Sequence, residues 1–141
     1  MSLFGPRDFL ALAEVSAFIE RSKNFRPESE ILSDARALLF FETRKQHTWL
    51  VATRARAYCI LDDRRKPEPH INWAINRSKI FADSGEFVLG LEVAERDKPS
   101  NVSGHLHFGP EHRRWLYSKA LFRTEPPEVA IENFLRGAME P

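Results

Sequence analysis

The chain has 141 residues, of which 43% are hydrophobic and 29% charged, and this composition is typical of one soluble globular domain. It excludes a collagen-like, coiled-coil or wholly disordered chain. The 21 Lys and Arg residues nearly balance the 20 Asp and Glu residues, so the formal net charge is +1 and any binding to nucleic acid or an anionic membrane has to be local.

The N-terminal region predicts an amphipathic helix from about residue 8 to residue 21. Its apolar residues recur at spacings of three and four, and they are Phe9, Leu12, Val15, Phe18 and Ile19. A polar stretch with a proline follows, so we divide the chain into residues 1–29, the helix with its connection, and residues 30–141, the main β domain. The apolar face of the helix needs a cover, either the sheet or a second copy of the chain.

Targeting signals are not apparent. The first eight residues lack the basic region and apolar stretch of a secretory signal, and no apolar run reaches the roughly 18 residues that span a bilayer. The lone cysteine, Cys59, cannot form an internal disulfide. We therefore expect a cytoplasmic protein in which Cys59 is a small buried hydrophobic residue.

Three apolar runs in succession predict strands at residues 37–41, 48–52 and 57–61. The polar connections between them are too short for the helix of a parallel crossover, so the runs form an antiparallel meander. The charged, proline-containing stretch at residues 62–69 ends this meander as a surface loop, in which the acidic residues Asp62 and Asp63 lie at the surface.

The second half of the chain predicts further strands and a final helix. Residues 71–75 alternate with period two, and residues 86–93 and 102–108 form a hairpin, whereas residues 111–122 fit either a strand or an irregular loop. Thr124 can cap a helix with Pro126 and Pro127 in its first turn and an apolar face at Val129, Ile131, Phe134, Leu135 and Ala138. The expected fold class is α+β and β-rich, a bent antiparallel sheet or partial barrel capped by the C-terminal helix, with an additional N-terminal helix.

Residues 48–62 read Thr-Trp-Leu-Val-Ala-Thr-Arg-Ala-Arg-Ala-Tyr-Cys-Ile-Leu-Asp, which is a strand, a Thr-x-x-Arg turn, an aromatic-bearing strand and a terminal acidic residue. In this pattern, and in the order of meander, second set of strands and C-terminal helix, the chain resembles the pleckstrin-homology-like (PH-like) superfold. The resemblance is particularly to the GRAM and small bacterial PH-like modules. The resemblance covers roughly residues 30–139 and implies a recognition module, without choosing among lipid, peptide and protein ligands.

Basic and aromatic side chains interleave in residues 112–119, a composition suited to stacking on nucleic-acid bases or to anchoring a partner. The predicted contact residues are Arg113, Arg114, Trp115, Tyr117 and Lys119. The alternative is that Trp115, Leu116 and Leu121 pack under the C-terminal helix while the arginines remain in water. The favoured function is a noncatalytic PH-like binding or adaptor domain that recognises a protein or peptide partner.

A second hypothesis is a metal-binding protein or a metal-dependent hydrolase. His105 and His107 alternate on a strand, so both imidazoles point to the same face and could ligate one ion. A third ligand has to come from Glu111 or His112 beyond the following turn, or from His47 or His70 if the fold brings them near.

A third hypothesis is a membrane-surface module that binds a phosphoinositide or another anionic lipid. Lys45, Arg54 and Arg56 resemble the basic pattern of phosphoinositide-binding members of the superfold. They fall in two successive hairpin turns, however, so they need not converge on one phosphate. The bases at residues 64–66 could add to such a surface.

Catalysis finds little support in the sequence. A Gly-x-Ser-x-Gly elbow and a glycine-rich phosphate loop are both missing from the chain. We therefore expect no catalytic residue, no cofactor and no nucleic-acid partner. The sequence leaves open the ligand, the pathway and whether the protein forms a homo-oligomer.

Overall fold

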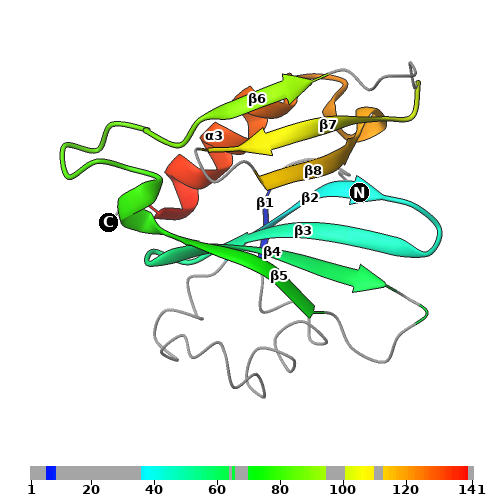
Figure 1. Ribbon diagram of the computed structural model, residues 1–141, viewed down its shortest axis with the longest axis horizontal. Helices are drawn as coiled ribbons and strands as arrows, with labels where there is room; N and C mark the ends of the chain where they lie inside the picture. Colours follow the sequence, from blue (N-terminus) through cyan, green and yellow to red (C-terminus); the bar gives the residue numbers. More distant parts are fainter. Residues whose placement is uncertain are drawn as a thin grey trace.

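The computed structural model describes residues 6–8, 36–63, 65, 70–94, 101–109 and 113–139 (Figure 1). These residues form two antiparallel sheets and a C-terminal helix, which confirms the β-rich α+β class. The sheets do not close into a barrel within this part of the chain. The helix predicted at residues 8–21 lies outside the described residues, apart from Asp8.

The larger sheet is the predicted three-stranded meander with one further strand at each edge. Its five strands pair in chain order and all pairs are antiparallel: β1 (Pro6–Asp8), β2 (Arg36–Glu42), β3 (Gln46–Ala52), β4 (Arg56–Asp63) and β5 (His70–Asn76). The strand β1 was not predicted, because three residues are too few to show the alternation of apolar and polar side chains that indicates a strand. It pairs Pro6 with Leu38 and Asp8 with Arg36.

The two hairpins of the meander share one local design. In the first, the hydroxyl of Thr43 accepts hydrogen bonds from the backbone N–H groups of Lys45 and Gln46, at 3.3 and 3.0 Å. In the second, the hydroxyl of Thr53 accepts from Ala55 and Arg56, both at 3.2 Å. A threonine side chain therefore fixes each turn in place of a glycine.

The smaller sheet contains three strands in chain order, β6 (Leu91–Ala94), β7 (Ser103–Phe108) and β8 (Arg113–Ser118). The ambiguous stretch after Gly109 thus contains a strand, which the 3₁₀ helix η3 (Lys119–Phe122) follows. The predicted strand at residues 86–93 is shorter than expected, because its first half pairs locally. The N–H of Ala82 donates to Glu86 and that of Val88 to Ile80, just after η2 (Arg77–Lys79).

The C-terminal helix α3 (Pro127–Met139) contacts β2, β3 and β6 and covers one end of the space between the sheets (Figure 1). Four residues of its predicted apolar face are buried, but Val129 is 43% exposed. The helix also begins three residues after Thr124, since Pro126 and Pro127 set its start. At its other end, Arg77 Nε donates to the carbonyl of Met139 at 3.1 Å.

Hydrophobic clusters form on both faces of the five-stranded sheet. One cluster lies between the two sheets and α3, and there the rings of Phe40 and Phe108 meet edge to face at 6.1 Å. The other lies on the opposite face and includes Trp49, Tyr58 and Leu121. Trp49, Trp73 and Cys59 are buried as predicted, but Trp49 and Trp73 belong to opposite faces.

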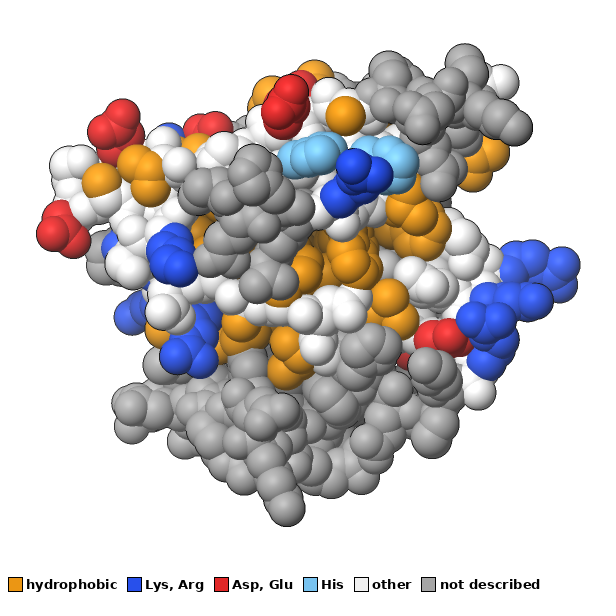
Figure 2. Space-filling model, in the orientation of Figure 1, with side chains coloured by type: hydrophobic (Ala, Val, Ile, Leu, Met, Phe, Trp, Pro, Cys, Tyr) orange, Lys and Arg blue, Asp and Glu red, His pale blue; other side chains and the backbone are white. Residues whose placement is uncertain are grey.

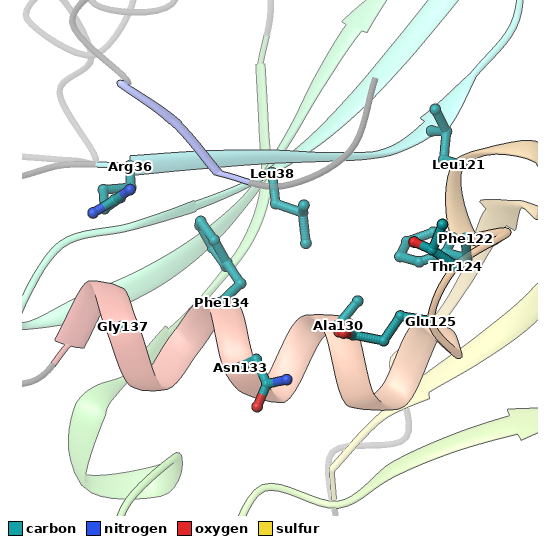
Figure 3. A pocket seen from close by; sticks show the side chains of 10 residues that line it. All are labelled: Arg36, Leu38, Leu121, Phe122, Thr124, Glu125, Ala130, Asn133, Phe134 and Gly137. Atoms are coloured by element: carbon teal, nitrogen blue, oxygen red, sulfur yellow. The ribbon is translucent and has the colours of Figure 1, made fainter. Parts of the chain in front are cut away.

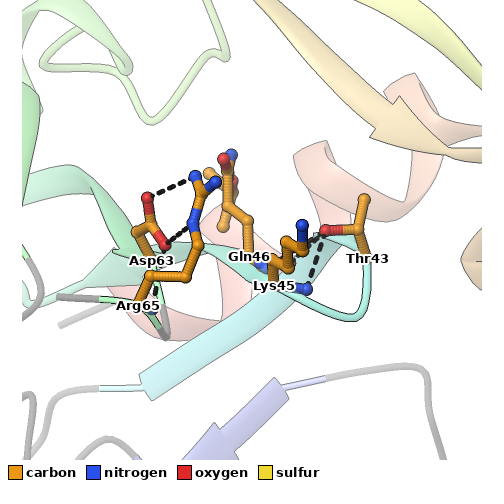
Figure 4. Close-up of polar contacts among 6 residues, drawn as sticks. Thr43, Lys45, Gln46, Asp63 and Arg65 are labelled. Carbon is orange, nitrogen blue, oxygen red and sulfur yellow. Dashed lines mark hydrogen bonds and ion pairs between the residues drawn. The ribbon is translucent and has the colours of Figure 1, made fainter.

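The prediction that Asp62 and Asp63 lie in a surface loop is wrong. Both residues end β4, and Asp63 is only 6% exposed. Its carboxylate accepts hydrogen bonds from the guanidinium of Arg65 at 2.9 and 2.8 Å and from the backbone N–H of Arg65 at 3.0 Å (Figure 4). These three bonds replace the water that burial removes.

Candidate functional site

A hollow of about 240 Å³ lies between the two sheets, beside β8. The ends of β3 and β4 contribute one wall, and β7 and β8 contribute the other. Figure 2 shows apolar side chains at the bottom of this opening, with basic side chains and histidines around it. The lining residues are Gln46, Leu61, His105, Arg114, Trp115 and Leu116.

The strand β8 has backbone groups that face this hollow. The N–H of Lys119 donates a hydrogen bond to the carbonyl oxygen of Val102, directly before β7, at 3.0 Å. In an antiparallel ladder every second residue bonds to the partner strand, so this bond identifies the residues of β8 that bond to β7. Residues 113, 115 and 117 therefore bond to β7, whereas Arg114, Leu116 and Ser118 direct their N–H and C=O groups to the other edge. In the described part of the chain, β7 is the only strand paired with β8, so we call this other edge the β8 edge.

At one end of the β8 edge, Ser118 ties the two sheets together. Its hydroxyl accepts a hydrogen bond from the N–H of Glu42 at 2.8 Å and donates to the carbonyl of Glu42 at 3.3 Å. This is where β2 and β8 come into contact. Arg114 and Leu116 make no such bond to β2 in the described structure, and the hollow opens beside them.

Charged and titratable side chains line the outer face of the three-stranded sheet. The register places Glu92, His107 and Arg114 in one row across the three strands, and His105 lies two residues from His107 on the same face of β7. Figure 2 shows two histidine side chains with a basic side chain between them over β7 and β8. Of these four, His105 and Arg114 also line the hollow.

The β2–β3 hairpin forms the opposite rim of the hollow. Arg44 and Lys45 are exposed at its turn, directly before the lining residue Gln46. The amide nitrogen of Gln46 donates to the hydroxyl of Thr48 at 3.3 Å. The Asp63–Arg65 pair lies beside this hairpin (Figure 4), because Gln46 and Asp63 are register partners. The Asp63 carboxylate raises the pKa of Arg65, so the guanidinium stays charged.

The five predicted contact residues do not share one surface. Arg114 and Trp115 line the hollow, whereas Lys119 is half-buried in η3 and the side chain of Arg113 lies outside the described residues. Tyr117 is buried, with its ring over Gly104 and edge to face with Phe122 at 5.9 Å. Successive residues of a strand face opposite sides, so Arg114 and Tyr117 lie on opposite faces of β8, whereas Arg114 and Trp115 both reach the hollow because it opens at the edge of the strand.

The three bases of the anionic-lipid hypothesis are not brought together. Lys45 precedes β3 and Arg54 follows it, so the seven residues of β3 separate them by about 20 Å at 3.3 Å per residue. Arg56 begins β4, at the same end of the sheet as Arg54. Arg56 lies near Tyr58, where burial outweighs the arginine's charge and raises the pKa of Tyr58 to about 12.

His105 and His107 share a face of β7, but no cluster of three metal-ligating side chains is found among the described residues. His47 lies on the other face of the larger sheet, edge to face with Trp49 at 6.4 Å and 3.6 Å from a carboxylate oxygen of Glu42. Glu111, His112 and the side chain of His70 fall outside the described residues.

A second cavity, of about 380 Å³, lies between α3 and β2 (Figure 3). Its apolar lining includes Leu38, Phe122 and Phe134, while Arg36 and Glu125 lie toward its two ends. This cavity could not be predicted from the sequence, because its residues come from three separate elements and form no motif.

The comparisons with known proteins give no match: no family model, no curated protein and no solved structure is significantly similar to this chain. Its helices, as far as the described residues show them, are all too short or too polar to cross a membrane.

Proposed function

We propose that the protein is a PH-like binding module that takes an extended peptide segment of a partner along the β8 edge, with one apolar side chain in the hollow. The observation that carries this proposal is the pair of outward-facing N–H and C=O groups at Arg114 and Leu116, directly beside an apolar hollow. Strand addition uses such backbone groups for affinity and a neighbouring pocket for specificity.

The dimensions of the hollow favour a peptide side chain over a free small molecule. At about 240 Å³ it is smaller than the roughly 300–1,000 Å³ typical of small-molecule sites. Leu61, Trp115 and Leu116 offer apolar contact, and an aromatic residue in a pocket is typical of the anchor points of protein interfaces.

The order of elements supports the PH-like part of the proposal. An antiparallel meander, a separate three-stranded sheet and a C-terminal helix follow one another, as in the superfold that residues 48–62 resemble. Because this superfold accommodates several ligand classes, the support for a peptide ligand comes from the β8 edge and the hollow and not from the fold.

The proposal is tested by blocking the β8 edge. A displayed library of random heptapeptides is selected on the intact protein, and the affinity of the enriched peptides is measured by fluorescence anisotropy. The substitution Leu116→Pro removes the outward N–H without breaking a bond to β7, and proline is tolerated at sheet edges. We expect it to weaken binding about tenfold or more, equivalent to about 1.4 kcal/mol.

The matched control is Leu116→Ala, which removes the same side chain and keeps the N–H. A larger loss in the proline variant than in the alanine variant supports strand addition. Equal affinity of the intact protein and the proline variant, with both folded by circular dichroism, contradicts it. Enrichment of no peptide on the intact protein also contradicts the proposed function.

A further inference from the structure

We infer that the peptide bound at the β8 edge is acidic, with carboxylate side chains on both sides of its apolar anchor. This inference rests on the proposed function and specifies its ligand. It follows from the charges on the two rims of the hollow. Neither the net charge of +1 nor any sequence motif reveals that these charges are grouped there.

The first rim is formed by β7 and β8. The guanidinium of Arg114 is exposed and forms no ion pair within the described residues, and His105 lines the hollow beside it. The acidic residue that the structure describes on this face, Glu92, lies two strands away from Arg114. At about 4.8 Å per strand the separation is close to 10 Å, a distance over which physiological salt screens most of the attraction. Arg114 is therefore available to a ligand carboxylate.

The second rim is the β2–β3 hairpin. Arg44 and Lys45 are exposed, and their side chains form no ion pair in the part of the chain that the structure describes. The described carboxylates next to the hairpin are directed elsewhere: Asp63 binds Arg65, and Glu42 lies 3.6 Å from His47 on the face of the sheet opposite the hollow, where the register also places Asp62. Among the described residues, the positive charge of Arg44 and Lys45 is thus not paired on the side of the hollow. Figure 2 shows basic side chains gathered on this side of the opening.

Both rims are positive and the bottom of the hollow is apolar, so the complementary segment carries acidic residues before and after one apolar residue. A single-stranded nucleic acid is also anionic and can stack on an aromatic ring. It lacks, however, the alternating N–H and C=O groups that would pair with Arg114 and Leu116 at the β8 edge. The positive rims of the hollow and the outward-facing backbone groups of the β8 edge together favour an acidic peptide.

The test uses the full-length chain and the same heptapeptide library. Selection on the intact protein is expected to enrich Asp and Glu on both sides of an apolar residue. In the charge-reversed variant Arg114→Glu, the best acidic peptide is expected to bind about tenfold more weakly, and selection shifts toward Lys and Arg. The control Arg54→Glu makes the same charge change at the far end of β3 and is expected to leave the affinity within about twofold.

Three results separate the two proposals. Enriched peptides without acidic residues, or equal losses in Arg114→Glu and Arg54→Glu, overturn the acidic ligand. If the enriched peptides still lose their binding in the Leu116→Pro variant, the proposed function survives. Displacement of the bound acidic peptide by a single-stranded oligonucleotide that binds Leu116→Pro equally well assigns the basic rims to nucleic acid and overturns this inference. A library that enriches nothing on the intact protein overturns the proposed function.

Discussion

The two sheets of this protein differ in how many of their faces are apolar. The five-stranded sheet is buried on both faces, with Phe40 toward the smaller sheet and Trp49 on the opposite side. The three-stranded sheet is apolar on its inner face, where Leu106 and Phe108 lie, and carries histidines, Arg114 and Glu92 on its outer face. Apart from the ends of β3 and β4 that line the hollow, a sheet buried on both sides offers little surface to a ligand, so the proposed recognition surface lies mainly on the smaller sheet and the rim next to it.

The largest change in stability is expected when large side chains are truncated on both faces of the larger sheet. We expect Phe40→Ala and Trp49→Ala each to lower the free energy of unfolding by about 3–5 kcal/mol, as buried aromatic residues do. His107→Ala, on the outer face of the smaller sheet, should change it by less than about 0.5 kcal/mol. Urea unfolding measures all three. A Trp49→Ala cost as small as that of His107→Ala would break the comparison.

Alkaline titration sharpens the comparison, because it reports how dry the second face of the larger sheet is. Burial raises the pKa of Tyr58 to about 12 from about 10 in the unfolded chain. The neutral phenol therefore contributes stability that is fully present below pH 10 and is lost as the pH rises from 10 to 12. The loss should reach about 2–3 kcal/mol, since one pKa unit corresponds to about 1.4 kcal/mol.

Tyr58→Phe is the control for this titration, because phenylalanine has no proton to lose. Stability curves of the two proteins, measured by urea unfolding, should diverge only above pH 10. Parallel curves up to pH 12 would show that Tyr58 ionises as readily in the folded protein as in the unfolded chain.

The smallest expected effect concerns the inner face of the smaller sheet, which should be as tightly packed as the larger sheet. A Cβ at Gly104 would lie 2.7 Å from the ring of Tyr117, so Gly104→Ala should cost about 1–3 kcal/mol. The matched substitution Gly137→Ala in α3 meets nothing within 4 Å. It should stabilise the protein by about 0.5–1 kcal/mol. Thermal denaturation compares the two, and equal melting temperatures would indicate a loosely packed inner face.

The fold class could be predicted because the strands of the meander are long, strongly apolar and joined by short polar turns. The strands β2, β3 and β4 therefore appear at nearly their predicted positions. The strand β1 could not be predicted, since it depends on the edge of β2 and not on its own three residues. Asp63 was misjudged for a similar reason, because the partner that makes its burial possible lies in the following loop.

The candidate site was only partly visible in the sequence. Arg114 and Trp115 stood out by their composition, and both line the hollow, as does His105 from a competing hypothesis. Gln46 and Leu61 could not be identified, because they reach the hollow only through the packing of one sheet against the other. The β8 edge could not be identified either, because it is defined by the packing of the sheets: among the described residues, no strand pairs with the backbone of β8 on that side.

Because a threonine side chain holds each hairpin turn of the meander, the conformation of the turn does not depend on the charged side chains at its tip. The hydroxyls of Thr43 and Thr53 hold the turns, so the residues at the tips, such as Arg44 and Lys45, are not needed for the conformation. Those tips can change in sequence while the strand register stays constant. A scaffold with this property can acquire new ligand preferences by surface substitution alone, and the turn beside the hollow is the position at which to redesign them.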